Sequence, residues 1–256
     1  MAAEEVNNSA GGAQLDGPVS VTNAEGRLIE RANFVRGVLH GAFTTWKPDG
    51  SVERKANFKN GLLHGEMQDM REGEQTLHFS EGKLHGEMLS SVNGVPEVRA
   101  MCKDGQREGE MLLYDPDGKV STKAAFKGGK LEGELLKYSA GKLSMKALYK
   151  EGRQEGETVF YDATGNVMAR MFFHAGKMTG LASWFGPDRA LVRSSTYKDG
   201  RLNGRTTEYF PNGKPRKTSI YKDDVLDGEV SIYKENGKVK ETQHYRNGKP
   251  VASGKK

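Results

Sequence analysis

The chain is poor in the residues that build a deep core. Apolar residues make up 35% of its 256 positions, against roughly 45–50% in an average globular protein on a broader count that includes glycine. Its single cysteine, Cys102, excludes an internal disulfide framework and fits a reducing compartment. No window approaches 18 consecutive apolar residues, which excludes a membrane-spanning helix. Residues 1–16 hold no apolar stretch of the kind found in secretory signals. We therefore expect a soluble, cytoplasmic protein with thin packing.

Motifs that carry catalysis are also missing. The sequence has no phosphate-binding glycine loop, no zinc-protease helix and no nucleophile elbow. A protein with thin packing offers few deep, dry pockets, which catalysis generally needs. We expect no catalytic residues, no cofactor, no metal and no small-molecule substrate.

Glycine, in contrast, is abundant and regularly placed. The chain has 33 glycines, and most of them recur at fixed phases of a repeat of about 24 residues. Such self-similarity is typical of an array of one small structural unit. The glycines that open the successive repeats are Gly17, Gly41, Gly65, Gly86, Gly109, Gly133, Gly156, Gly180, Gly204 and Gly228.

One repeat, residues 109–132, shows what the unit is. A short apolar run meets the turn signal Asp115-Pro116-Asp117-Gly118, and a second run leads to the turn Lys127-Gly128-Gly129-Lys130. Short runs separated by Asp-Gly or Asn-Gly turns are typical of β-hairpins. We predict an all-β fold, an elongated single-sheet antiparallel array of about ten β-hairpin repeats over residues 17–254. Residues 1–16 are expected to be a disordered tail, and residues 255–256 a basic end.

Apolar side chains recur at three phases of the repeat, and we expect each set to stack as a ladder between neighbouring hairpins. Same-phase residues should lie roughly 10 Å apart, because each repeat contributes two strands at ~4.8 Å. Seven residues before an opening glycine stand Phe34, Phe58, Phe79, Cys102, Phe126, Tyr149, Phe173, Tyr197 and Tyr221, continued by Tyr245. Two residues before it stand Leu39, Leu63, Leu84, Arg107, Leu131, Gln154, Met178, Leu202 and Leu226. Five residues after it stand Trp46, Met70, Ser91, Tyr114, Tyr138, Tyr161, Phe185, Tyr209 and Tyr233.

The pattern Gly-Glu-x-x-x-Tyr-x-x-x-Gly-Lys, followed by an aromatic residue and x-x-Gly-x-x-x-Gly, resembles the MORN repeat. It is most similar to the variant form found in bacterial proteins labelled antitoxin-like. The resemblance implies a scaffold whose surfaces are used for protein contacts, membrane attachment or toxin neutralisation, rather than one activity. Instances begin at Gly133, Gly156, Gly204 and Gly228.

Some repeats depart from the pattern. The repeat from Gly65 is three residues short, and the repeat from Gly180 has Arg189-Ala190 where the hairpin glycine is expected. Asp223-Asp224 replaces the usual Asp-Gly before Gly228. Departures of this kind arise by drift or mark contact sites. Trp184 and Phe185 fall in the irregular repeat from Gly180, so we regard them as contact candidates.

Three other features are better explained by structural roles than by metal binding or catalysis. His40, His64 and His85 share one phase, so they should lie ~10 Å apart, too far to bind one metal. Glu108, Glu132 and Glu155 occupy the same phase later, which indicates an exposed and tolerant position. Cys102 replaces a ladder aromatic, which predicts a buried thiol. Asp115 and Asp117 resemble the start of a calcium loop, but the later ligands are missing.

Positive charge gathers in the C-terminal repeats. Residues 197–256 hold 14 Lys and Arg against 8 Asp and Glu, while the whole chain has a net charge of +5. Two interpretations stay open: lysines that protect a sheet edge from aggregation, or a surface for an acidic partner. The candidate partner-binding residues are Trp184, Phe185, Arg189, Lys198, Arg201, Arg205, Lys214, Arg216 and Lys217.

The function we expect is a non-enzymatic protein-binding scaffold of the antitoxin or immunity type, which sterically covers a partner protein with an acidic surface, such as a toxin. An alternative is association with an anionic membrane through the basic repeats. A net charge of this size gives little support for nucleic-acid binding.

Overall fold

The computed structural model describes residues 14–251, which divide into two compact units that meet in the sequence at Gln106 and Arg107. Residues 1–13 of the expected tail, and the expected basic end at residues 255–256, lie outside the described residues. Gln14, Leu15 and Asp16 precede the first strand, and the carbonyl oxygen of Leu15 accepts a 2.7 Å hydrogen bond from the N–H of Gly37.

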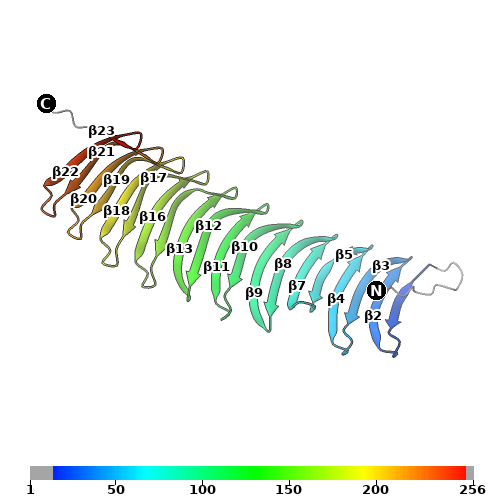
Figure 1. Ribbon diagram of the computed structural model, residues 1–256. Helices are drawn as coiled ribbons and strands as arrows, with labels where there is room; N and C mark the ends of the chain where they lie inside the picture. The colour runs from blue at the N-terminus through cyan, green and yellow to red at the C-terminus, as the bar shows by residue number, and fades with distance from the viewer. Residues whose placement is uncertain (1–13, 252–256) are drawn as a thin grey trace. The chain divides into compact units, whose positions relative to one another are not determined.

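Unit 1 is one layer of antiparallel strands joined as hairpins (Figure 1). Each strand pairs with the next along the chain, and the short β5 extends the pairing of β4 beside β6. The strands are β1 (Gly17–Thr22), β2 (Leu28–Val35), β3 (Val38–Trp46), β4 (Val52–Lys59), β5 (Leu62–Leu63), β6 (Gly65–Asp69), β7 (Glu74–Ser80), β8 (Lys83–Val92) and β9 (Val95–Lys103).

Unit 2 repeats the same antiparallel hairpin arrangement. Its strands are β10 (Gln106–Tyr114, of which Gln106 belongs to unit 1), β11 (Val120–Lys127), β12 (Lys130–Ser139), β13 (Lys142–Lys150), β14 (Arg153–Gln154), β15 (Gly156–Tyr161), β16 (Val167–His174), β17 (Lys177–Phe185), β18 (Leu191–Lys198), β19 (Arg201–Tyr209), β20 (Pro215–Lys222), β21 (Val225–Tyr233), β22 (Val239–Arg246) and β23 (Lys249–Val251). The predicted all-β fold class is confirmed in both units. Within residues 14–251, no helix is long and apolar enough to cross a membrane.

Two kinds of turn alternate, as the repeat pattern predicts. At one end of the strands, two residues with positive φ form the turn, for example Gly128 (φ 55°) and Gly129 (φ 78°). At the other end a five-residue turn closes with the N–H of Gly118 donating to the carbonyl oxygen of Asp115 at 2.9 Å. The first kind also links repeats, since the N–H of Gly129 donates to the carbonyl oxygen of Arg107 at 2.9 Å. The turns therefore hold successive hairpins in register.

Most opening glycines lie in strand bulges rather than in turns. In unit 1 the partners Ala32–Phe43 and Phe34–Leu39 leave three residues of β3, including Gly41, opposite the single residue Asn33. Gly41 has φ 94°, a left-handed conformation that an L-residue adopts only with strain. The bulge therefore explains why glycine recurs at the position that opens a repeat.

The best-buried side chains differ from the predicted ladders. The aromatic residues seven before each opening glycine are half-buried. Most residues two positions earlier are buried and are alanine or serine, whereas Leu77, Met171 and Gln243 in that row are half-buried. The aromatic ladder therefore does not supply the best-buried side chains. In a single layer a large ring stays partly in water even where it has a neighbour, as Phe126 does in Arg107, whereas a small side chain is hidden among its neighbours. Cys102, 8% exposed, is buried as expected. The buried members of this row are Ala32, Ala56 and Ala100 in unit 1, and Ala124, Ala147, Ser195 and Ser219 in unit 2. Ala182 and Thr206, which lie opposite Ser195 and Ser219, are buried as well.

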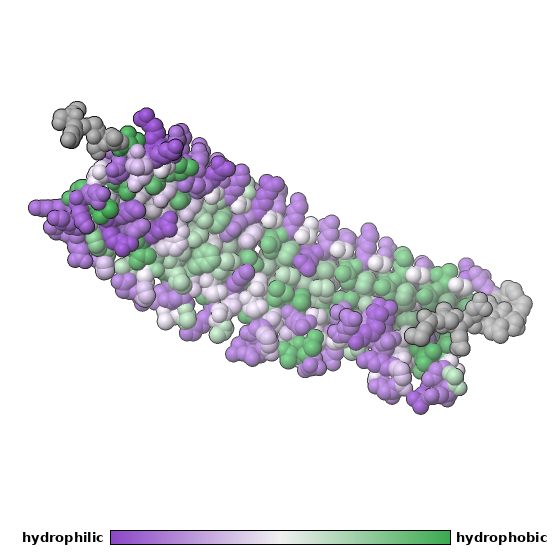
Figure 2. All heavy atoms as spheres, viewed as in Figure 1, coloured by the Kyte–Doolittle hydropathy of each residue, from purple (hydrophilic) through white to green (hydrophobic). Residues whose placement is uncertain are grey.

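The two faces of each sheet differ in character. We call the face of unit 2 that carries Ala124, Ala147 and Ala182 its alanine face. Side chains alternate between the faces along a strand, so Glu110, Glu134 and Glu157, each directly after an opening glycine, stand on the other side, which we call the carboxylate face of unit 2. In the view of Figure 2, apolar residues lie along the middle of the strands of each unit, between largely hydrophilic strand ends.

Arg189 occupies a turn position that favours glycine. It has φ 66°, and its N–H donates to the carbonyl oxygen of Gly186 at 2.9 Å, as Gly118 does for Asp115. A left-handed conformation costs an L-residue about 1–2 kcal/mol. We expect Arg189→Gly to raise the free energy of unfolding by about 1 kcal/mol in urea denaturation. Arg189→Ala keeps the Cβ and should give no gain; an equal gain from both would assign the effect to the guanidinium.

Candidate binding groove

A regular row of ion pairs crosses the carboxylate face of unit 2. Each pair joins the glutamate that follows an opening glycine to a lysine or arginine on the next strand: Glu110 with Lys123, Glu134 with Lys146, and Glu157 with Arg170. The Arg170 Nη1 to Glu157 Oε1 distance is 2.8 Å. Side chains this exposed gain little stability from pairing, about 0–1 kcal/mol per pair. The row keeps this part of the face evenly neutral and hydrated.

The row stops at the repeat that opens with Gly180. Leu181 stands at the glutamate phase there and is 53% exposed. In the next repeat Arg205 takes that phase, which reverses the charge. Arg205 is exposed and makes no side-chain hydrogen bond or ion pair with any residue in the described part of the chain. The face therefore changes from paired charges to one free guanidinium flanked by an exposed leucine.

The central row of the carboxylate face changes at the same place. Strand pairing aligns six hydroxyl residues across β17–β22, where the earlier strands carry lysine, leucine, valine and arginine. Two tyrosines at the phase five after an opening glycine contact this row: the Tyr209 hydroxyl lies 3.1 Å from Ser194 Oγ, and the Tyr233 hydroxyl 3.5 Å from Thr218 Oγ1. The six residues are Ser183, Ser194, Thr207, Thr218, Ser231 and Thr242.

These changes produce an open groove of about 490 Å³ on the carboxylate face of unit 2. Its lining combines aromatic rings, hydroxyls, aliphatic groups and one cation, without any carboxylate or amide side chain. A concave site with a few polar groups among apolar surface is the usual form of a binding site. The lining residues are Leu181, Ser194, Thr196, Arg205, Thr207, Tyr209, Pro215, Thr218, Tyr233 and Gly237.

Of the nine candidate residues from the sequence, only Arg205 lines this groove. Trp184 pairs with Arg193 on the alanine face, where the guanidinium carbon of Arg193 lies 5.1 Å from the Trp184 ring centroid. Phe185, the next residue, takes part in the bulge that ends β17, and Arg189 lies in the turn beyond. Neither aromatic residue lines the groove.

The basic candidates are also dispersed. Lys198 and Arg201 face each other across the β18–β19 turn, at one end of the strands. Lys214 lies at the other end, where its Nζ donates to the carbonyl oxygen of Asn236 at 3.3 Å. Arg216 pairs with Glu208 at 2.6 Å, and Lys217 lies opposite Glu208 in the register. The structure thus distributes these charges over both strand ends, with Arg216 and Lys217 beside Glu208.

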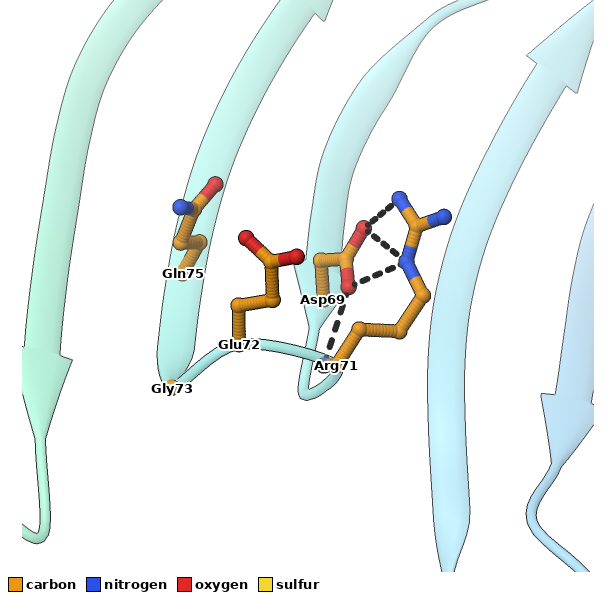
Figure 3. Close-up of a pocket in the computed structure, with 5 residues that line it drawn as sticks. All are labelled: Asp69, Arg71, Glu72, Gly73 and Gln75. Carbon is orange, nitrogen blue, oxygen red and sulfur yellow. Dashed lines mark hydrogen bonds and ion pairs between the residues drawn. The ribbon is translucent and has the colours of Figure 1, made fainter.

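A second cavity, of about 300 Å³, lies in unit 1 where the short repeat replaces the usual five-residue turn (Figure 3). Asp69, 7% exposed, accepts hydrogen bonds from the Arg71 guanidinium, including one of 2.6 Å, and these lower the pKa of its carboxyl. Arg54 Nε lies 3.5 Å from Asp69 Oδ2 without hydrogen-bond geometry. The Asp69 carboxylate is thus occupied by Arg71 and stabilises the turn.

The position directly before an opening glycine, where His40, His64 and His85 stand in the early repeats, has a structural role that the sequence did not indicate. Glu108, Glu132 and Glu155 are not at a tolerant position: their carboxylates accept 2.7–2.9 Å hydrogen bonds from the turn N–H groups of Gly128, Glu151 and Ala175. The bond from Ala175, followed by that from His174, lowers the pKa of Glu155. In the part of the chain that the structure covers, no three His, Cys, Asp or Glu side chains group as metal ligands.

The observed architecture defines a class of protein, a β-hairpin repeat array with a groove on one face. Four segments of the chain match the model of the MORN repeat variant family: residues 39–60, 107–127, 202–223 and 226–247. Each segment is about one repeat long, and the last two contain strands that line the groove. No curated protein sequence matches the chain. MORN repeats are generally repeat modules that bind proteins or membranes, and they are not a known enzyme family.

Proposed function

We propose that this protein is a non-enzymatic scaffold that binds a partner protein with the groove on the carboxylate face of unit 2. One observation carries the proposal: the ion pairs of Glu110, Glu134 and Glu157 end where a groove with an unpaired Arg205 begins. A repeat that served only to extend the sheet would be expected to keep these paired charges. An exposed leucine beside tyrosines and a free guanidinium is the composition of protein contact sites.

The mechanism would be steric. Each hairpin is held by backbone hydrogen bonds to the hairpin before it, for example from Gly200 N–H to the Met178 carbonyl oxygen at 2.8 Å. A face fixed in this way loses little conformational entropy on binding. We propose an antitoxin or immunity role, in which the bound scaffold covers the working surface of a toxin in the cytoplasm. The free thiol of Cys102 is compatible with that reducing compartment.

Affinity capture from the native host tests this function. The full chain is immobilised through its N-terminus, and bound material is identified by mass spectrometry at low and high salt. Because the groove combines apolar and hydroxyl surface with one charge, we expect one stoichiometric protein that survives high salt. Recovery of anionic lipid or nucleic acid alone, lost as salt rises, would favour membrane or nucleic-acid binding and reject the scaffold role.

The antitoxin role requires a separate experiment, because a captured protein need not be a toxin. The captured protein is expressed in a test host with and without this chain. Growth arrest that the chain relieves is the expected result. A harmless captured protein would leave the scaffold function standing and eliminate the antitoxin role.

A further inference from the structure

The groove has the chemistry of a receptor for one kind of segment. Resting on the proposed function, we infer that it binds an acidic–aliphatic segment of the partner: a carboxylate side chain pairs with Arg205, and a neighbouring aliphatic side chain packs against Leu181. The occupant is thus an Asp- or Glu-containing stretch of a protein chain.

The charge environment of Arg205 supports the carboxylate. Arg205 lies directly opposite Ile220 in the register, so its cross-strand neighbour cannot neutralise it. Glu229, at the same phase of the following repeat, is engaged by Ser231, whose Oγ donates to Glu229 Oε1 at 2.6 Å. Glu208, the next carboxylate along β19, is paired with Arg216. The guanidinium of Arg205 remains available, and its fork geometry fits a carboxylate with two parallel hydrogen bonds.

The remaining surface supports an apolar neighbour for that carboxylate. Leu181 is 53% exposed, and Pro215 and the rings of Tyr209 and Tyr233 add further apolar lining. The hydroxyls of both tyrosines lie against Ser194 and Thr218, so these polar groups have partners inside the protein. An aliphatic side chain buried here gains roughly 25 cal/mol for each Å² removed from water.

The same lining disfavours other ligands. Recognition of a sugar uses carboxylate and amide side chains that bond several hydroxyls at once, and the lining has neither. A nucleic acid needs several cations along its backbone, and Arg205 is the only charged residue among those that line the groove. An acidic–aliphatic protein segment matches one cation beside apolar surface.

Selection of peptides on the full chain tests the inference. A display library of random 12-residue peptides is selected against the purified protein, and the affinities of the selected peptides are measured by fluorescence polarisation. We expect enrichment of sequences that pair Asp or Glu with Leu, Ile or Val. Their affinity should fall about 30-fold or more in Arg205→Glu, as for loss of a buried charge pair.

Arg201→Glu is the matched control, because it makes the same charge change on the same strand, β19, but at the turn opposite Lys198. It should leave peptide affinity within about threefold, the effect of a rim charge. Circular dichroism melting verifies that both variants are folded.

No enrichment of acidic peptides, or equal losses in both variants, would overturn the inference. Binding on a glycan array that depends on Arg205 would also overturn it, in favour of a sugar. A host protein captured equally by the wild type and Arg205→Glu would refute this inference while the scaffold function stands.

Discussion

Replacing Ala147 by lysine is expected to lower the free energy of unfolding of unit 2 by about 3–5 kcal/mol, because it forces an unpaired charge into the buried row. Ala147 is 0% exposed and pairs with Leu135, itself 8% exposed. A lysine there must bury its ammonium group or push the two strands apart. The measurement is a urea titration followed by far-ultraviolet circular dichroism.

The neighbouring residue supplies the control. Leu148 is 37% exposed and stands on the carboxylate face opposite Glu134. Leu148→Lys should change stability by less than about 1 kcal/mol, since the new charge remains in water. The same side chain at adjacent positions thus tests which of the two positions is buried. Equal losses from the two variants would show that Ala147 is not the better-buried of the two positions.

Gly228→Ala is expected to cost about 3 kcal/mol or more, through strain and overpacking together. Gly228 has φ 141°, and a Cβ added there would lie 2.8 Å from the Cβ of Ile220. Backbone atoms fix both positions, so no side-chain rotation relieves the contact.

Gly180 is the matched position, because it opens a repeat in the same way but has φ 69° and no atom within 4 Å of an added Cβ. Gly180→Ala should cost only about 1–2 kcal/mol, the strain of a left-handed residue. Thermal melting of the two variants provides the comparison. If Gly180→Ala is the more damaging variant, the bulge geometry is not what requires glycine at this phase.

The hairpin fold could be predicted because it depends on local signals. The turns that contain Gly118 and Gly128–Gly129 have the positive φ values that Asp-Gly and Gly-Gly pairs indicate. The irregular turns also stand out in the sequence, and Arg189 and Asp224 show what replaces glycine: both residues adopt positive φ themselves, 66° and 69°. The period of the repeat and the residues of its turns therefore predict the strands and their order in the sheet without knowledge of tertiary contacts.

The core was harder to predict, because burial in a single layer does not follow side-chain size. The sequence pattern drew attention to aromatic residues such as Phe126, whereas Ala124, two residues earlier, is the buried one, 2% exposed. Hydrophobicity alone ranks phenylalanine above alanine. Only the neighbouring strands show which position is covered on all sides.

The site could be predicted only in part, because bulges disturb the alternation of faces. The bulge between Glu208 and Tyr209 leaves Arg216 without a register partner, and its guanidinium pairs with Glu208, so counting by twos along β20 fails at Arg216. Arg205 was included among the candidates for its charge. The more specific signal, arginine at the phase where six repeats carry glutamate, was present in the sequence but has meaning only once that phase is known to form ion pairs.

The central claim is that a partner protein sits on the carboxylate face of unit 2, and cysteine footprinting of the complex tests it most directly. Thr196→Cys places a thiol in the groove, and Glu241→Cys places one on the alanine face opposite Ile232. The native Cys102 is buried and provides a constant background. Alkylation rates are measured with and without the captured partner. We predict that the partner protects Thr196→Cys and leaves Glu241→Cys unchanged; protection of Glu241→Cys with Thr196→Cys still reactive would contradict the account.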